Sequence, residues 1–122
     1  MIPKFRIYCY ETQEMLVARD YRELAELFAG PDADGSIYSD LMQSTGLLDK
    51  NDKEIFESDI VEWEHKDTGQ LVRGIIKYDT ELGFWGMTDV RFKELKAIGY
   101  LSEQNVTALG NKFENLELVE GL

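Results

Sequence analysis

The chain has 122 residues, with 24 Asp or Glu against 13 Lys or Arg, and its net charge is -11. This length and a hydrophobic content of 43% predict a single domain, residues 1–122, that buries its own core. The acidity argues against direct nucleic-acid binding, which depends on Lys and Arg meeting phosphates. The single cysteine excludes an intramolecular disulfide, and no apolar run is long enough to cross a membrane, so we expect a cytoplasmic protein.

The N-terminal portion, residues 1–48, begins with a pattern typical of a β-hairpin. Residues 4–10 alternate between apolar and polar side chains, which indicates a strand with two different faces. Residues 11–14 are polar and form the expected turn, and residues 15–18 return as the second strand.

A helix is predicted next, at residues 21–29. Asp20 and Glu23 have the spacing of a capping box, in which side chains satisfy the free amides of the first turn. Gly30 ends the helix and Pro31 prevents its continuation. Within the helix an apolar stripe is expected to face the core, formed by Tyr21, Leu24, Leu27 and Phe28.

The remaining sequence predicts a strand, a turn-rich connector and a small antiparallel β-barrel. Residues 37–43 are expected to be the strand and residues 44–59 the connector. The barrel portion, residues 55–122, contains expected strands at 60–65, 71–78, 82–87 and 106–109, a bulge or bend at Gly74, a short helix at 90–98 and an irregular tail at 110–122.

Three stretches, in order along the chain, carry a resemblance to a known family. They are Lys4-Phe5-Arg6 followed by Met15, the block QSTGLLDKNDKEIFESDIV at residues 43–61, and LGNKFENLEL at residues 109–118. Together they are similar to motifs of the YopX family of phage and prophage proteins. In the central block, Asp52 and Ser58 stand where that family has glycine. Asp tolerates left-handed backbone angles better than most residues, so the first of these turns should survive.

This resemblance implies a β-rich fold with a small barrel, a phage or prophage gene in a bacterial host, and self-association into homo-oligomers. It implies no biochemical activity and supplies no catalytic residue. The matched motifs consist of turn-forming, strand-forming and charged loop residues, which structure alone explains.

The residue types that carry chemistry do not form a recognisable site. Cys9 and His65 are far apart in sequence, and no pattern places them together as a nucleophile and its base. The segment from Asp49 resembles a calcium loop, but Glu54 stands at the position that requires Gly and Ile60 at the position that requires Glu. A turn with solvated charges explains this segment better.

The acidic residues of the barrel portion give no sharper hypothesis. Glu57, Asp59, Glu62 and Glu64 crowd one region, and the last two share one face of a strand, opposite Trp63. We interpret them as a solvated face, because hydrolytic chemistry needs a cleft and a perturbed carboxylate pair. We therefore predict no catalytic residue, no metal ligand and no cofactor.

Four aromatic residues on adjacent predicted strands form the candidate interaction surface: Trp63, Tyr78, Phe84 and Trp85. Packing in the core or a subunit interface is the favoured interpretation. Stacking of nucleobases and a groove for peptides stay open as alternatives, although single-strand binders combine such rings with a positive groove.

The expected fold class is α+β and mainly β: an N-terminal hairpin and helix, followed by an SH3-like barrel with one short helix. The expected function is that of a non-enzymatic phage accessory protein that contacts its own copies and a host or phage protein. The alternative is a nucleic-acid-related role, either single-strand binding by the barrel or acidic mimicry of DNA. We expect no membrane partner.

Overall fold

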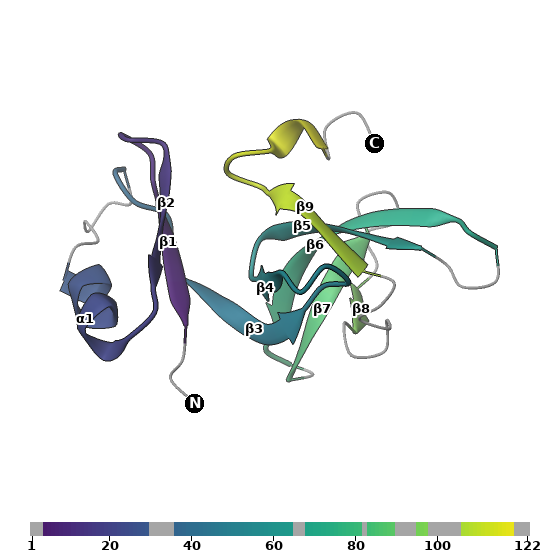
Figure 1. Ribbon diagram of the computed structural model, residues 1–122, viewed down its shortest axis with the longest axis horizontal. Coiled ribbons are helices and arrows are strands. Elements are labelled where there is room, and N and C mark those ends of the chain that lie inside the picture. The colour runs from purple at the N-terminus through teal and green to yellow at the C-terminus, as the bar shows by residue number, and fades with distance from the viewer. Residues whose placement is uncertain are drawn as a thin grey trace. The chain divides into compact units, whose positions relative to one another are not determined.

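The computed structural model describes residues 4–29, 36–64, 68–81, 83–89, 95–97 and 106–118. The chain is mainly β and forms two compact units, residues 1–44 and residues 45–122 (Figure 1). The elements are β1 (Phe5–Cys9), β2 (Glu14–Ala18), α1 (Tyr21–Ala29), β3 (Met42–Leu48), β4 (Glu54–Phe56), β5 (Asp59–Glu64), β6 (Leu71–Asp79), β7 (Phe84–Asp89), β8 (Leu95–Ala97), β9 (Val106–Asn111) and the 3-10 turn η2 (Leu116–Leu118). In the described parts of the chain, no helix has the length and apolar character that a bilayer crossing requires.

The first unit contains the predicted hairpin. Strands β1 and β2 pair antiparallel, with Ile7 opposite Leu16, and the start of β3 pairs with β1 on its other side. Ile7 and Ala18 are almost completely buried, whereas Leu16 is partly exposed. The strand predicted from the alternation of residues 4–10 is confirmed, but its polar side is not exposed, because Arg6 and Tyr8 are buried as Ile7 and Cys9 are.

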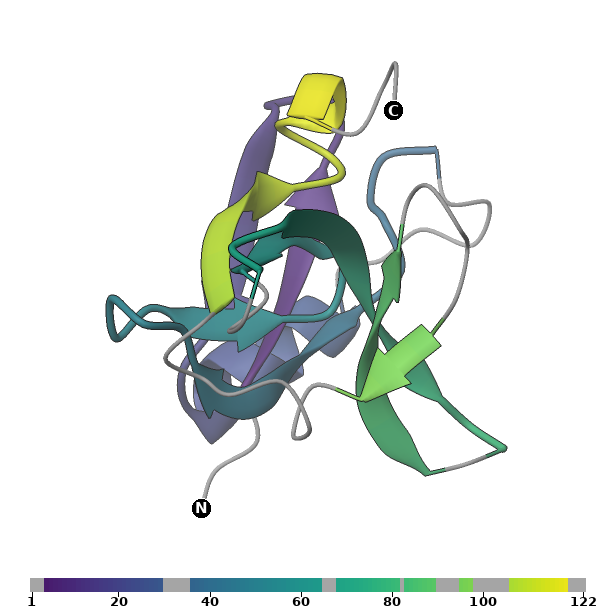
Figure 2. The same ribbon diagram turned by 90° about the vertical axis from the view of Figure 1, so that its right-hand side faces the viewer.

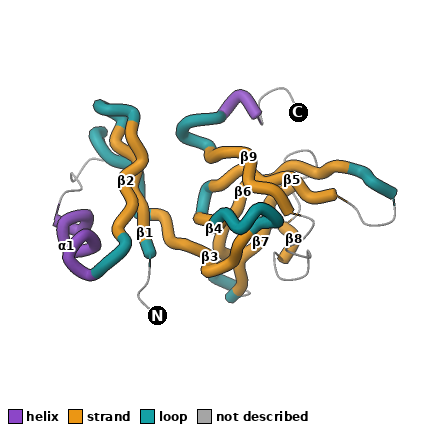
Figure 3. Tube along the Cα trace, viewed as in Figure 1, coloured by secondary structure: helices purple, strands orange, loops and turns teal. Residues whose placement is uncertain are grey.

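Helix α1 occupies the predicted residues, and Figure 3 shows it as the helix of the first unit. The carboxylate of Asp20 accepts a hydrogen bond from the N–H of Glu23 at 2.8 Å. The carboxylate of Glu23 accepts one from the N–H of Arg19 at 2.9 Å, one residue earlier than the standard capping box. The expected apolar stripe is wrong at Tyr21, which is 65% exposed. Leu24 is half-buried, and the side chains of Leu27 and Phe28 lie outside the described part.

The strand predicted at residues 37–43 is wrong over most of its length. Only Tyr38 forms an isolated bridge, to Cys9, and the regular strand β3 begins at Met42. The cause is Ser39, whose hydroxyl accepts the N–H of Tyr8 at 2.9 Å in the place of a main-chain carbonyl. A side chain that replaces the ladder partner interrupts the regular pairing.

The second unit contains a curled antiparallel sheet in the order β8-β7-β6-β5-β9, shaped as a half-barrel (Figure 2). Its strands confirm the four strands predicted at residues 60–65, 71–78, 82–87 and 106–109, with shifts of one or two residues at the ends, and residues 65 and 82 lie outside the described residues. The core inside the curl consists of Ile55, Val61, Val72, Ile76, Met87 and Val106.

Gly74 does not form the expected bulge. It keeps regular register between Val61 and Asp89, and the register shift lies instead between Ile60 and Val61 against β9. A Cβ at residue 74 would overlap the side chain of Met87 and come within 2.5 Å of the Thr88 carbonyl oxygen. Glycine is therefore required here because β7 approaches closely.

The helix predicted at residues 90–98 is wrong at residues 95–97. Residues 95–97 form β8, which pairs antiparallel with β7, and the rest of the predicted helix lies outside the described residues. The apolar spacing suggested a helix, but the edge of β7 offers main-chain partners and tertiary pairing overrides local propensity. The tail is also more regular than expected, because β9 continues to Asn111 and η2 follows.

We expect Gly74→Ala to lower the free energy of unfolding by about 1–3 kcal/mol, because the added methyl group overpacks the contact with β7. Urea denaturation measures the change. The control is Gly46→Ala, where the φ of 78° costs about 1 kcal/mol of backbone strain but no atom lies within 4 Å of the added Cβ. A smaller loss for Gly74→Ala than for the control would contradict the steric explanation.

Candidate functional site

The carboxylate of Asp49 accepts three main-chain hydrogen bonds. Its Oδ1 accepts the N–H groups of Asn51 and Lys53, each at 2.8 Å, and its Oδ2 accepts the N–H of Ala108 at 2.9 Å. The first two bonds build the turn after β3, and the third joins that turn to β9. Asp49 is only 4% exposed, so the expectation of solvated charges in this turn is wrong at this residue.

The surroundings of Asp49 keep its carboxylate ionised. Burial raises the pKa of the carboxyl group, but the N–H donors of Ala108, Lys53 and Asn51, together with the charge of Lys53, outweigh burial and leave the pKa below its ordinary value. Its oxygens are occupied by amide groups, which supports a structural function. Within the described residues, no group of three or more His, Cys, Asp or Glu could hold a metal ion.

Other polar residues of the 43–61 block also bond to the main chain. The Thr45 hydroxyl donates to the Ile55 carbonyl oxygen at 2.7 Å and accepts the N–H of Leu47 at 3.1 Å. The buried carboxylate of Asp59 accepts the N–H of Phe56 at 2.8 Å. These bonds hold β3, β4 and β5 together locally.

Two residues of the block other than glycine adopt left-handed backbone angles, at the positions where the family has glycine. Asp52 has a φ of 63° and Ser58 a φ of 72°. The first turn therefore survives the substitution, as expected from the tolerance of Asp. At Ser58 the backbone keeps the same geometry. The N–H of Ser58 donates to the Ile76 carbonyl oxygen, and its carbonyl oxygen accepts the N–H of Lys112.

The closing motif at residues 109–118 is a second bonded turn. The Asn111 side-chain carbonyl accepts the N–H groups of Phe113 at 3.0 Å and Glu114 at 2.9 Å, and its amide donates to the Glu114 carboxylate at 2.9 Å. The Asn115 side chain accepts the N–H of Asn111 at 3.2 Å and fills the space where a Cβ at Gly110 would lie. The residues of this motif therefore also stabilise the local backbone structure.

The interpretation of the acidic residues as a solvated face is wrong at Asp59, which is buried, and at Glu62, which is paired. Glu62 accepts a hydrogen bond from Arg73 at 3.0 Å, and Arg73 also donates to the Leu118 carbonyl at 2.9 Å. Glu64 is exposed, as expected. The pair joins β5 to β6, and the second bond attaches η2 to β6.

Of the Cys9 and His65 pair, His65 lies outside the described residues. The thiol of Cys9 is buried in the first unit. Hydrogen bonds from the side chain and main chain of Thr12 lower the pKa of this thiol. Cys9 lies at the end of β1, next to the turn that contains Thr12.

The four aromatic residues of the candidate interaction surface do not gather in one place. Tyr78 and Trp85 are cross-strand partners with ring centroids 5.1 Å apart, and Tyr78 is 42% exposed. Trp63 pairs with Val72, six residues from Tyr78 along β6, which corresponds to about 20 Å. Trp63 and Trp85 pack against the core, and the side chain of Phe84 lies outside the described part.

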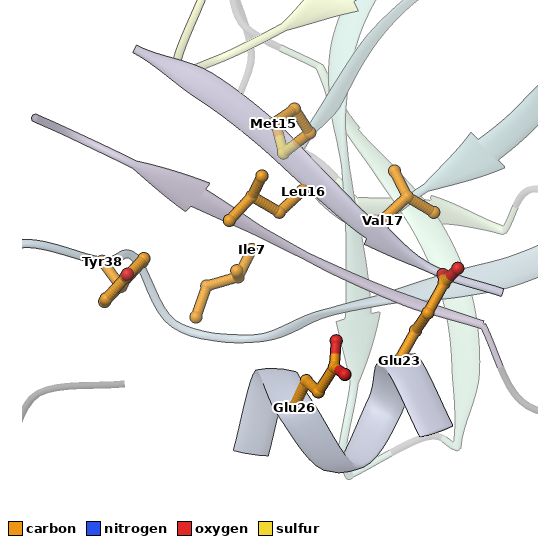
Figure 4. A pocket seen from close by; sticks show the side chains of 7 residues that line it. All are labelled: Ile7, Met15, Leu16, Val17, Glu23, Glu26 and Tyr38. Carbon is orange, nitrogen blue, oxygen red and sulfur yellow. The ribbon is translucent and has the colours of Figure 1, made fainter. Parts of the chain in front are cut away.

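The first unit carries a groove that the sequence did not reveal, with a volume of about 480 Å³ (Figure 4). Its apolar surface comes from β1, β2 and Tyr38, and its acidic side comes from two carboxylates of α1. The lining residues are Ile7, Met15, Leu16, Val17, Glu23, Glu26 and Tyr38. The hairpin and the helix were predicted separately, and only their packing creates the groove.

The fold and these contacts define a small, mainly β protein in which the motif residues build turns and strand connections. A family model described as YopX protein matches residues 4–120, so the chain belongs to the YopX family and the resemblance is confirmed. The chain is also similar to a solved structure, the crystal structure of protein EF1440 from Enterococcus faecalis. The two share 27% identity and a TM-score of 0.59, over 98% of this chain and 99% of that chain. No curated protein matches the chain.

We expect Asp49→Asn to lower the free energy of unfolding by about 2–3 kcal/mol at neutral pH, because an amide nitrogen replaces one accepting oxygen in a buried site. Asp52→Asn, in the same turn but exposed, should change it by less than about 0.5 kcal/mol.

The pH dependence of this difference follows from the pKa of Asp49. The folded-state pKa lies below the unfolded value of about 3.9. The stabilisation by the ionised Asp49 carboxylate is therefore complete above that value, and it is lost as the pH falls through the folded-state pKa. Urea denaturation of the wild-type protein and of Asp49→Asn across this pH range should show the difference in their free energies of unfolding becoming smaller in acid. A gap that stays constant would refute the charge-assisted role.

We expect Ser58→Gly to raise the free energy of unfolding by about 1 kcal/mol, because glycine adopts a left-handed φ without steric cost. Ser44→Gly, at an ordinary φ within β3, should instead destabilise the protein. Thermal unfolding of the two variants compares them, and an equal loss in both would show that Ser58 is not strained.

Proposed function

We propose that this YopX family protein is a non-enzymatic accessory protein of phage or prophage origin that acts by contacting its own copies and other proteins. The observation that supports this most is the use of the motif side chains. Asp49, Asp59 and Asn111, three polar residues of the motifs, bond to main-chain amides. Because these polar residues hold the fold together, we infer that the protein acts by offering its exposed surfaces to other proteins.

We also propose that the second unit closes in the manner of an SH3-like barrel. Support comes from the outer edge of β9, which bonds to the turn after β3. The N–H of Lys50 donates to the Val106 carbonyl at 2.9 Å, and Asp49 accepts the N–H of Ala108. These bonds occupy an edge that would otherwise pair with another chain, which favours assembly through other surfaces.

The proposal favours proteins over nucleic acid as partners. Direct binding of a single strand requires successive stacking rings beside positive charge. The aromatic set offers Tyr78 and Trp85 as one adjacent pair, in a chain with a net charge of -11. Acidic mimicry of DNA would also act through a protein contact, so it is the alternative form of this proposal.

Light scattering coupled to gel filtration tests self-association, and we expect a mass that is a multiple of 14.1 kDa and depends on concentration. Affinity capture from the bacterial host identifies other partners, and fluorescence anisotropy with labelled oligonucleotides at low salt should show no saturable binding. A monomer that captures no specific protein would overturn the proposal, and tight oligonucleotide binding would replace it with the direct nucleic-acid role.

A further inference from the structure

The first unit has an open strand edge beside its groove. Strand β2 is the last strand of its sheet, with β1 as its neighbour. Tyr8 bonds through both main-chain groups to Ser39, on the side of β1 away from β2. In an antiparallel pair, a residue that faces away from its partner strand is opposite a residue that also faces away.

This rule assigns two residues of β2 to the outer edge. Tyr8 is opposite Met15, and Arg6, which pairs with β3 on the far side of β1, is opposite Val17. The N–H and C=O groups of Met15 and Val17 therefore point outward. Among the residues that the structure describes, these groups have no hydrogen-bond partner.

The groove reaches this edge. Figure 4 shows the side chains of Met15 and Val17 pointing away from α1, whereas those of Leu16 and Ile7 point toward it. Met15 and Val17 nevertheless line the groove, so their contribution is the main chain along the edge of β2. An extended segment paired with this edge would thus lie along the groove.

We propose that the β2 edge and its groove bind an extended segment of a partner protein in which Lys or Arg alternates with aliphatic residues. The inference rests on the proposed function of the protein as a contact module and names the chemistry of one partner. Main-chain groups of Met15 and Val17 provide the hydrogen bonds of an added strand. The side chains of the added strand alternate between the groove and the opposite face.

The groove favours cationic side chains at the positions that face it. Leu16 and Tyr38 give an apolar surface for the aliphatic stem of Lys or Arg, and Glu23 and Glu26 lie where the charged head would reach. One oxygen of Glu23 accepts the N–H of Arg19, and Glu26 is 3.9 Å from Arg22 in an exposed pair of little strength. Both carboxylates can therefore meet a cation.

The spacing of the two carboxylates also suits an added strand. Glu23 and Glu26 are three residues apart on α1, a rise of about 4.5 Å. Residues i and i+2 of a strand, which face the same side, are about 6.6 Å apart. Two successive groove-facing Lys side chains therefore reach the two carboxylates without bending the strand.

A second copy of this chain suits the edge poorly. Each copy would bring a net charge of -11 and a groove lined by Glu23 and Glu26, and like charges repel. A basic partner removes this repulsion and reduces the strong negative charge of the protein.

The test uses a fluorescein-labelled hexapeptide of alternating Val and Lys and its Val and Glu counterpart, measured by fluorescence anisotropy with the full chain. We expect saturable binding of the Lys peptide that weakens with salt, and none of the Glu peptide. Glu26→Lys should weaken binding about tenfold, because one attraction becomes a repulsion. The matched control, Glu117→Lys, makes the same charge change on an exposed residue of the second unit and should leave binding unchanged.

The main-chain bonds are tested separately. Val17→Pro removes an outward N–H at a position where an edge strand tolerates proline, and it should weaken binding about tenfold or more. A hexapeptide N-methylated at alternate residues tests the same bonds on the unaltered protein, and one of its two methylation registers should lose binding. This measurement decides the question if the proline variant fails to fold, which circular dichroism detects.

The inference would be overturned by binding of both peptides alike, by equal effects of Glu26→Lys and Glu117→Lys, or by no effect of either methylation register. Loss of the oligomer in Val17→Pro would assign the edge to a second copy and also overturn it. A protein that assembles or captures partners but ignores the Lys peptide refutes this inference alone. A monomer without partners refutes the proposed function instead.

Discussion

The second unit depends on one buried charge, the carboxylate of Asp49, and on the amides that surround it. It accepts bonds from its own turn and from Ala108, a residue 59 positions away. A buried carboxylate is costly unless such donors replace its water, so the turn and β9 have to be in place together. The bond from Ala108 holds β9, the edge strand of the curled sheet, against the turn, and this helps to enclose the core inside the curl.

The same principle recurs at the other turns of the motifs. Asp59 accepts an amide of the segment just before β5, and Asn111 accepts two amides of the turn after β9. Short polar side chains are well suited to this, because they reach main-chain groups two or three residues away. These polar residues of the motifs therefore maintain the backbone path.

Local sequence signals predicted much of the fold, and their failures have specific causes. The hairpin and α1 follow from alternation and capping, which involve residues close in sequence. The helix expected at residues 90–98 was wrong at 95–97 because that segment pairs with β7. The strand expected at 37–43 was wrong because the Ser39 hydroxyl takes the place of a main-chain partner. In both cases a distant contact outweighed the local preference.

The sequence by itself determined the family, the acidic charge, the hairpin, the helix and the turn positions, because each depends on composition or on neighbouring residues. Only the tertiary structure decided that Asp49 is buried, that Trp63 lies far from Tyr78, and that a groove opens beside β2. Burial, the side of a sheet and the free edge of a strand are all set by segments that meet only on folding. No local pattern encodes which strand is left without a neighbour.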